Sequence, residues 1–293
     1  MSLKLLPKAK MTESTLLITS HHKQDAFLDL LKERFLAVHV GKTLSNLDLN
    51  IMADNTGENI SSKNKTFCEL TAFYWAWKNT TSDYIGFMHY RRLFSTKNFI
   101  LQKALMRMKY NFHYLRSTFV EFDINLCLKN SIELSNLADI KESIKGLELF
   151  VQNDLRNYDI VLPKKFYSKY LNVEQQYRLY HNHDDLNLLM DLVKAKYPDI
   201  GVHIKDTLKK NELYTYNMFI MKRDLFNDYC EKLFDILFEM EKMIVLQNKN
   251  DYQKRIFGFL SERFFNLYIK HINKNNTLRI TELETIFLKE PNI

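Results

Sequence analysis

The chain has 293 residues, of which 46% are hydrophobic and 26% charged, a composition typical of a globular rather than a disordered protein. Its formal charge is +7, but the lysines are dispersed and no nucleic-acid-binding motif is present, so we expect no nucleic-acid partner. No apolar run approaches the roughly 18 residues that cross a bilayer, and the N-terminus does not have the pattern of a secretory signal.

The cysteines and glycines exclude several classes of site. Cys68, Cys127 and Cys230 are far apart and lack CxxC spacing, which argues against a disulfide framework and a cysteine zinc site and favours the reducing cytoplasm. The six glycines are too scattered for a dinucleotide-binding motif or a P-loop.

The first predicted elements alternate between strand and helix. Residues 15–19 and 36–40 are short apolar runs that predict buried strands, and the second is closed by Gly41. Between them, apolar residues from Phe27 to Phe35 recur at helical spacing. Two buried strands joined through a helix indicate a βαβ unit and a parallel sheet.

A polar loop at residues 53–65 precedes the next predicted helix. Thr66 and Glu69 have the spacing of a capping box, which predicts that this helix starts at residue 66. The buried strand expected at 83–88 leads directly into His89-Tyr90-Arg91-Arg92.

Residues 95–150 are predicted to be a basic, mostly helical insertion, with an amphipathic helix at 101–116. That helix could rest on an anionic membrane surface or be a solvated lid, and both interpretations stay open.

The C-terminal half alternates again. Strands are expected at 158–162 and 214–221, helical sequence at 173–196 and 251–271, and a polar tail after residue 271. A further long helix is expected to begin at an Asp224 cap and reach Ile244. The chain is therefore predicted to be α/β, with a mostly parallel sheet, in a single domain spanning 1–293.

Polar residues follow three predicted strands at the edge where open α/β sheets bind ligands. They are His21-His22-Lys23, the loop 54–64, and His89-Tyr90-Arg91-Arg92. Two adjacent arginines suit a diphosphate, although a solvated strand end with surface ion pairs is the more common explanation of such a doublet. Upstream, Asp54, Asn55, Asn59 and Asn64 could bind a sugar or a base by hydrogen bonds.

Several segments together resemble a known family. They are Asp54–Ser61, Cys68–Asn79, Asp83–Arg92, Tyr158–Pro163, Tyr216–Met221 and Arg255–Arg263, within about residues 15–272. The chain resembles a bacterial capsule and O-antigen family, formerly a domain of unknown function, that is assigned as galactofuranosyltransferases with a GT-A-like fold.

The resemblance implies an inverting glycosyltransferase. The donor would be a UDP-sugar, UDP-galactofuranose, and the acceptor a hydroxyl on a lipid-linked capsule or O-antigen glycan. Such an enzyme would be cytoplasmic, with peripheral contact at the inner face of the plasma membrane. The alternative is a non-catalytic glycan-binding or scaffold domain of the same fold.

A GT-A fold normally carries Asp-x-Asp for a divalent metal, and this chain has none. We expect guanidinium charge to replace the metal, so no cofactor is predicted, although manganese or magnesium, with His89 as a ligand, stays an alternative. The predicted donor-binding residues are His21, His22, Lys23, Gly41, Asp54, Asn55, Asn59, Asn64, His89, Tyr90, Arg91, Arg92, Asn217, Arg255 and Arg263.

Glu262 is the predicted general base, since on a helix it would share a face with Arg255. The alternative is a buried pair with Arg255 or Arg263 that braces the helix. Glu174 and Asp159 are reserves, and Asp159 is expected to be structural because it precedes a strand.

Glu174 and His181 are predicted to lie on the acceptor side. His181, His183, Asp184 and Asp185 resemble a metal cluster, but His-x-His on a helix points its imidazoles apart, so a polar surface or a cap is favoured. The aromatic residues Phe73, Trp75 and Trp77 are expected in the core rather than at a stacking platform.

Overall fold

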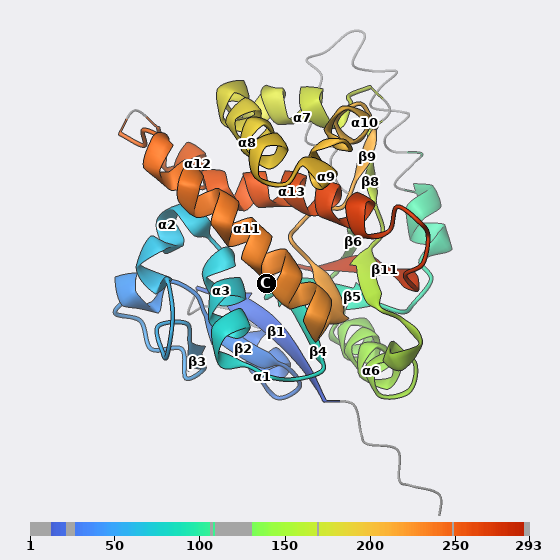
Figure 1. The fold of residues 1–293 in the computed structure, drawn as a ribbon. Coiled ribbons are helices and arrows are strands. Elements are labelled where there is room, and N and C mark those ends of the chain that lie inside the picture. The colour runs from blue at the N-terminus through green and yellow to red at the C-terminus, as the bar shows by residue number, and fades with distance from the viewer. Residues whose placement is uncertain are drawn as a thin grey trace, which may run out of the picture.

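The computed structural model describes residues 13–21, 27–105, 108, 131–168, 170–247 and 249–289. A mixed β-sheet runs through the middle of the molecule, with helices on both faces (Figure 1). The helices are α1 (Leu28–Lys32), α2 (Asn64–Phe67), α3 (Leu70–Asn79), α6 (Leu137–Asn153), α7 (Val173–Tyr180), α8 (His183–Lys196), α9 (Pro198–Gly201), α10 (Ile204–Leu208), α11 (Arg223–Met243), α12 (Asp251–Lys254) and α13 (Ile256–Ile272), with 3-10 turns at Lys42–Leu44, Ser61–Lys63 and Leu155–Asn157.

The N-terminal half of the sheet is parallel. Strands β1 (Ser14–Ser20), β2 (Leu36–His39), β3 (Met52–Ala53) and β4 (Tyr84–His89) lie in the order β3-β2-β1-β4, and each neighbouring pair is parallel. The predicted βαβ unit is confirmed, with α1 as the connecting helix.

The other half of the sheet mixes the two directions. Strand β10 (Phe219–Lys222) runs antiparallel to both β4 and β7 (Ile160–Pro163). Strand β11 (Ile280–Leu288) runs parallel to β7 and β6 (Ile132–Leu134) but antiparallel to β5 (Arg92–Ser95). Two further short strands, β8 (Phe166–Tyr167) and β9 (Glu212–Leu213), form a separate antiparallel pair.

The predicted mostly parallel sheet is therefore wrong in this half. Of the pairings in the main sheet among the described residues, five are parallel and four antiparallel. Part of the reason is local, because only Tyr90 and Arg91 separate β4 from β5, and so short a connection can join only antiparallel strands.

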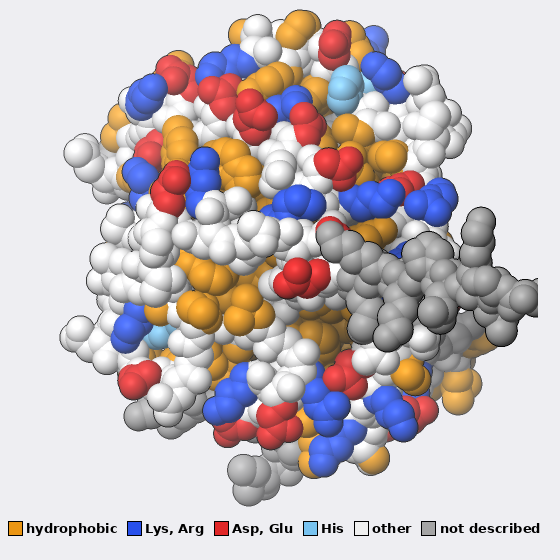
Figure 2. All heavy atoms as spheres, turned by 60° about the horizontal axis from the view of Figure 1, so that its bottom comes forward, with side chains coloured by type: hydrophobic (Ala, Val, Ile, Leu, Met, Phe, Trp, Pro, Cys, Tyr) orange, Lys and Arg blue, Asp and Glu red, His pale blue; other side chains and the backbone are white. Residues whose placement is uncertain are grey.

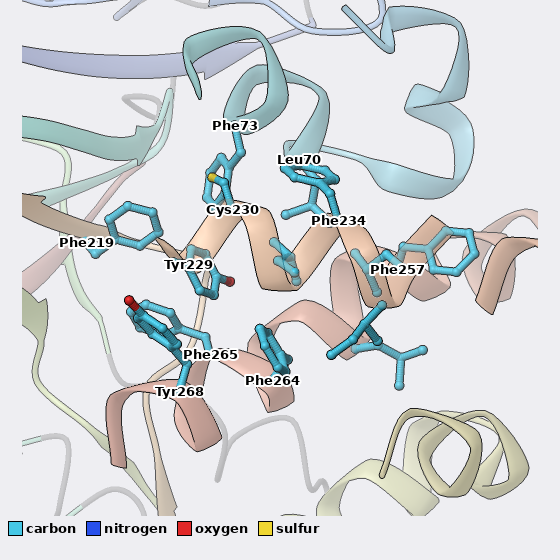
Figure 3. Packing of buried hydrophobic residues seen from close by; sticks show 14 of the residues in the cluster. Leu70, Phe73, Phe219, Tyr229, Cys230, Phe234, Phe257, Phe264, Phe265 and Tyr268 are labelled. Atoms are coloured by element: carbon cyan, nitrogen blue, oxygen red, sulfur yellow. The ribbon is translucent and has the colours of Figure 1, made fainter. Parts of the chain in front are cut away.

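Alternation along the strands divides the core into two layers. Leu17 of β1 and Phe87 of β4 face a cluster built with α3, α11 and α13, shown in Figure 3. Ile18 and Met88, the next residues along, face a second cluster built with α1 and α6. Because successive side chains of a strand point to opposite faces, one strand contributes to both layers. Phe73 and Trp75 are buried in the first cluster, as predicted, and Trp77 packs against it.

Residues 95–150 contribute to the main sheet where the structure describes them. Strand β6 pairs with β11, and α6 buries Ile140, Ile144 and Leu147 in the second cluster. Residues 100–105 are helical, whereas most of the predicted basic helix at 101–116 lies outside the described residues. Within the described part, Lys97 pairs with Glu142 (2.5 Å) and Lys103 pairs with Glu284 of β11.

The polar tail expected after residue 271 is wrong. Residues 280–288 form β11, which joins β5, β6 and β7 and buries Ile286 and Leu288 completely. Five polar or charged side chains among the nearby residues 274–279 hide the short alternating pattern that follows. The strand forms because other parts of the chain supply partners on both of its edges.

Several predicted helices are interrupted. The capping box is wrong, because Cys68 has φ 52° and separates α2 from α3, so that the Glu69 side chain turns elsewhere. The helix predicted at 173–196 is split into α7 and α8, and the side chain of Asn182 caps α8. The helix predicted from residue 251 is also split, since Arg255 separates α12 from α13.

Two smaller boundaries also move. The strand predicted at 214–221 begins only at Phe219, because Tyr216 and Asn217 adopt left-handed conformations. Helix α11 begins at Arg223, with Asp224 in its first turn rather than at the cap.

Candidate active site

Polar and charged side chains converge beyond the carboxyl ends of β1 and β4. They come from four separate places: the end of β4 and the start of β5, the junction of α2 and α3, the loop before β10, and the first half of α13. We call this group the central cluster, and it consists of Glu69, His89, Arg92, Asn217, Arg255, Glu262 and Arg263.

His89 joins the sheet to the loop before β10. One ring nitrogen, Nδ1, lies 3.2 Å from Thr19 Oγ1 of β1, and Nε2 lies 2.6 Å from the carbonyl oxygen of Tyr216. Burial lowers the pKa of His89 below its usual value, which keeps the ring neutral at physiological pH. Both ring nitrogens therefore lie within hydrogen-bond distance of protein oxygens, which fix the ring between β1 and the loop before β10.

Glu262 is held by two partners on opposite oxygens. The backbone N–H of Tyr216 donates to Oε1 (2.7 Å), and Arg263 donates from Nη1 to Oε2 (2.9 Å). The predicted alternative of a Glu–Arg pair thus exists with Arg263, which is almost fully buried, while the Glu262 side chain stays 19% exposed. Burial raises the pKa of Glu262, although Arg263 opposes the shift.

Glu69 meets Asn217 across 148 residues of sequence. Asn217 donates from Nδ2 to Glu69 Oε1 (2.6 Å) and to the Gly258 carbonyl (3.1 Å). Its own oxygen accepts from the hydroxyl of Ser261 (3.1 Å). The sequence predicted Glu69 only as part of a helix cap and not as a site residue. Its position in the segment Cys68–Asn79, which resembles the family, could have indicated a role in the site.

Gly258 allows α13 to approach the α2–α3 junction. A Cβ at this position would lie 3.3 Å from Cys68 Cβ and 3.4 Å from Cys68 Sγ. A side chain at position 258 would therefore crowd Cys68 at the α2–α3 junction.

The backbone around the central cluster is strained. Three of the non-glycine residues with positive φ are Cys68 (52°), Tyr216 (74°) and Asn217 (50°), and all three adjoin it. Such conformations cost free energy and concentrate at functional sites, where they hold side chains in a set geometry.

The arginines point to different rings. The Arg92 guanidinium lies over the ring of Tyr216 (4.6 Å), whereas the Arg91 guanidinium lies over the ring of Tyr90 (5.3 Å). The doublet therefore does not act as one planar donor array. Arg92 instead shares its surroundings with Arg255, since both lower the pKa of His89. Arg255 also donates from Nε to Cys68 Sγ (3.4 Å).

Asp54 organises the loop beside the central cluster. Its buried carboxylate accepts from the backbone N–H of Gly41 (2.7 Å), the hydroxyl of Thr71 (2.7 Å) and the hydroxyl of Ser61 (2.5 Å). Gly41 has φ +70° and contacts Asn64, so it must be glycine. These hydrogen bonds tie the loop to the end of β2 and to the start of α3.

The structure places three of the other predicted donor residues, namely Asn55, Asn59 and His21. Asn55 is exposed, and Asn59 caps its own turn by accepting from the Ser61 N–H (3.2 Å). His21 packs edge-on against Tyr90 at 6.0 Å. His22 and Lys23 lie outside the described residues.

The predicted acceptor residues lie on α7 and just after it. Glu174 pairs with His183 (3.0 Å). His181 stacks on Phe259 with 4.1 Å between ring centroids, and burial, helped by Arg263, lowers its pKa to about 4. Within the described ranges, no three His, Cys, Asp or Glu side chains group around a metal position.

Asp159 is structural, in agreement with the sequence. Its carboxylate pairs with Lys222 (2.6 Å) and Arg279 (3.1 Å) at the edge of the sheet where β4 begins. Burial alone would raise the pKa of Asp159, but the hydrogen bonds from these two cations outweigh it and lower the pKa.

The surface and the helices give two further observations. On the face shown in Figure 2, basic and acidic side chains are interspersed around hydrophobic ones. None of the helices in the part of the chain described here combines the length and apolar character needed to span a bilayer.

A family profile described as Domain of unknown function (DUF4422) matches residues 16–275. The chain belongs to this family. Among solved structures, it is similar to the apo form of the WbbM bifunctional glycosyltransferase, with 31% identity and a TM-score of 0.76. The match covers 95% of this chain and 46% of that one, so the present chain spans less than half of that protein. No curated protein matches the chain.

Proposed function

We propose that this protein is a glycosyltransferase that moves a sugar from a UDP-sugar donor to a hydroxyl of a glycan acceptor. Similarity to the WbbM bifunctional glycosyltransferase along almost the whole chain supports the reaction class. The convergence of arginines and carboxylates beyond the ends of β1 and β4 is the observation that carries it, because open α/β sheets bind ligands there.

Arg92 and Arg255 are the proposed diphosphate-binding side chains. Arg92 is held against the Tyr216 ring, and Arg255 is held against Cys68, so both charges are positioned before a donor arrives. As the bond between the sugar and UDP breaks, negative charge grows on the departing diphosphate. A preorganised donor that meets such charge lowers the activation barrier by about 3–4 kcal/mol.

Glu262 is the proposed general base. It accepts the proton of the acceptor hydroxyl, whose oxygen attacks the anomeric carbon from the face opposite UDP, so that the configuration inverts. UDP leaves with the bonding electrons. The raised pKa of Glu262 suits a proton acceptor, and the contacts with Tyr216 and Arg263 fix the orientation of its carboxylate.

The finer specificity belongs to the same proposal. The family resemblance implies galactofuranose as the transferred sugar and a lipid-linked capsule or O-antigen glycan as the acceptor. The location proposed with it is the cytoplasm, with peripheral contact at the inner face of the plasma membrane.

The test is a screen of UDP-sugars, including UDP-galactofuranose, by ligand-induced thermal shift, followed by an assay of UDP release with donor and glycan together. The proposal expects a shift with at least one donor and UDP release that needs the acceptor. Glycan binding without UDP release from any donor would instead identify a non-catalytic glycan-binding domain.

A further inference from the structure

A separate recess lies on the far side of α13 from the sheet, where α7 meets α8. It has a volume of about 230 Å³ and is lined by residues of the α7–α8 junction, the segment after α11 and the start of α13. That volume is below the range of sites for drug-sized ligands and suits a single small ring. Its lining residues include Tyr177, His181, Lys249, Gln253 and Phe259.

Stacked aromatic rings border the recess: His181 and Phe259 line it, and Tyr252 lies beside them without being a lining residue. His181 lies against Phe259 (centroids 4.1 Å apart, planes 27° apart) and against Tyr252 (5.8 Å, 16°). Tyr252, beside the lining residue Gln253, is 49% exposed although it is a large aromatic side chain. The negative face of an aromatic ring attracts the weakly positive C–H groups on one face of a sugar.

The floor of the recess contains an unused polar group. Tyr177 is fully buried, and its hydroxyl has no hydrogen-bond partner among the described residues. A buried hydroxyl without a partner costs free energy. Because this hydroxyl is itself buried, a ligand hydroxyl would recover that free energy only after neighbouring side chains shift to let it approach. His181 offers further hydrogen-bonding capacity, because a neutral imidazole has one donor and one acceptor nitrogen.

The charges at the recess balance one another. Lys249 pairs with Asp185 at 2.7 Å, and both side chains are nearly buried. The paired charges leave little net field, and a neutral ligand with hydroxyls therefore fits better than a phosphate or a carboxylate.

The recess is physically connected to the central cluster. The Arg263 guanidinium lies over the Tyr177 ring (5.1 Å) and donates to Glu262 (2.9 Å) and to Gln176 of α7. Arg263 and Tyr177 stand between the recess and the proposed base. A ring held in the recess is therefore a neighbour of the reacting sugar rather than the reacting sugar itself.

We propose that this recess is a subsite for a neutral sugar ring of the acceptor glycan, stacked on the bordering rings of Tyr252, His181 and Phe259 and hydrogen-bonded to Tyr177. This subsite rests on the proposed glycosyltransferase function for its role as an acceptor site. It would position the growing glycan while a different sugar unit presents its hydroxyl to Glu262.

Saturation-transfer NMR with methyl glycosides of galactose, glucose, mannose and N-acetylglucosamine tests the subsite. With the wild-type protein, saturation is expected to pass to the protons on one face of at least one glycoside. The Tyr252→Ala variant should weaken that binding about fivefold, the scale of one aromatic contact. Tyr167→Ala is the matched control, since Tyr167 is 64% exposed on β8 and does not line the recess, and it should bind as the wild type does.

UDP binding, measured by thermal shift on the same three proteins, separates this proposal from the general one. If UDP stabilises all three while no glycoside binds, or Tyr252→Ala binds as tightly as the wild type, the subsite is wrong and the enzyme proposal stands. Displacement of the glycoside by uridine would assign the recess to the nucleoside and overturn the subsite. If UDP has no effect but glycoside binding depends on Tyr252, the sugar site stands and the donor proposal fails.

Discussion

At the residue scale, the central cluster depends on a few side chains whose hydrogen bonds cross between distant segments. Asn217 is held in a left-handed conformation and connects Glu69 to α13, while Glu262 caps the neighbouring N–H of Tyr216. Each contact satisfies a buried polar group and also places a charge near the ends of β1 and β4. Stability and the proposed chemistry therefore share the same atoms, and substitutions must be chosen to separate them.

Replacement of Glu262 by Gln separates the two roles. The amide keeps an oxygen for the Tyr216 N–H, loses the ion pair with Arg263 and cannot accept a proton, so we expect transfer to fall about 10²–10⁴-fold. The thermal midpoint should also fall, because Arg263 loses a charged partner, but the protein should still unfold cooperatively. UDP release and thermal unfolding are measured in parallel with Glu148→Gln, a control on α6 that pairs with Arg34. A fully active Glu262→Gln protein would eliminate Glu262 as the base.

Asp54 is expected to matter for stability rather than for chemistry. Asp54→Ala leaves the buried donors of Gly41 and Ser61 without an acceptor and removes one of the two acceptors of the Thr71 hydroxyl, so the free energy of unfolding should fall by about 2–4 kcal/mol. Urea denaturation measures this change. Asn55→Ala, one residue along and exposed, is the matched control and should stay within about 0.5 kcal/mol of the wild type. Equal effects of the two substitutions would contradict the structural role of Asp54.

His181 should make stability depend on pH. Its pKa is about 4 in the folded protein and near 6.5 in the unfolded chain, so the unfolded state binds the proton first as pH falls. The free energy of unfolding therefore decreases as pH drops from about 6.5 towards 4. Because the ring is partly exposed, we expect a loss of about 1–2 kcal/mol rather than the full linkage value.

The comparison that isolates this effect is His181→Gln, which cannot titrate. His39, His89 and His203 also have lowered pKa values, chiefly through burial, but they are shared by both proteins and cancel. Urea denaturation at pH 7 and pH 5 should show the wild type losing about 1 kcal/mol more than the variant. Parallel losses in the two proteins would show that the ring titrates normally.

At the element scale, interruptions of regular structure build the site. Arg255 separates α12 from α13, and its guanidinium lies against Cys68 at the α2–α3 junction. The break at His181 and Asn182 between α7 and α8 leaves the imidazole free to stack on Phe259. A continuous helix through residue 255 would move Arg255 away from the central cluster. A continuous helix through residues 181 and 182 would remove the His181 ring from the recess.

Strand β11 is the element whose loss should cost most. It connects β5, β6 and β7, so Ile286→Ala, at a fully buried position, is expected to lower the free energy of unfolding by about 2–4 kcal/mol. Ile280→Ala, the same substitution at the partly exposed start of the strand, should cost less than half as much. Denaturant titration compares the two, and a smaller effect at Ile286 would show that β11 is not integral to the sheet.

At the scale of the whole molecule, the central cluster combines three arginines with two carboxylates. Arg92, Arg255 and Arg263 exceed Glu69 and Glu262 by one positive charge, which favours an anionic donor. The interspersed charges in Figure 2 contrast with this local concentration.

The guanidinium charge in the central cluster predicts that sugar transfer does not depend on a metal ion. Because Arg92 and Arg255 face the proposed diphosphate position, UDP release should be unchanged in excess EDTA. The assay compares rates before and after chelation and after adding manganese. Loss of activity that manganese restores would refute guanidinium replacement of the metal.

The sequence by itself determined the features that depend on neighbouring residues. Short apolar runs identified β1, β2, β4 and β7, because burial is largely a local property, and the polar residues at the end of β4 and just after it include His89 and Arg92 of the central cluster. The quoted segments also led to the family that the profile match then showed.

Only the tertiary structure decided the features that need partners from elsewhere in the chain. The mixed direction of the sheet and the existence of β11 depend on strands far apart in sequence, and the Glu69–Asn217 contact joins residues 148 positions apart. The His181 stack likewise needs α13 beside α7. Local sequence patterns do not encode such long-range contacts, because the free energy that favours them comes from packing and hydrogen bonds between segments that meet only as the chain folds.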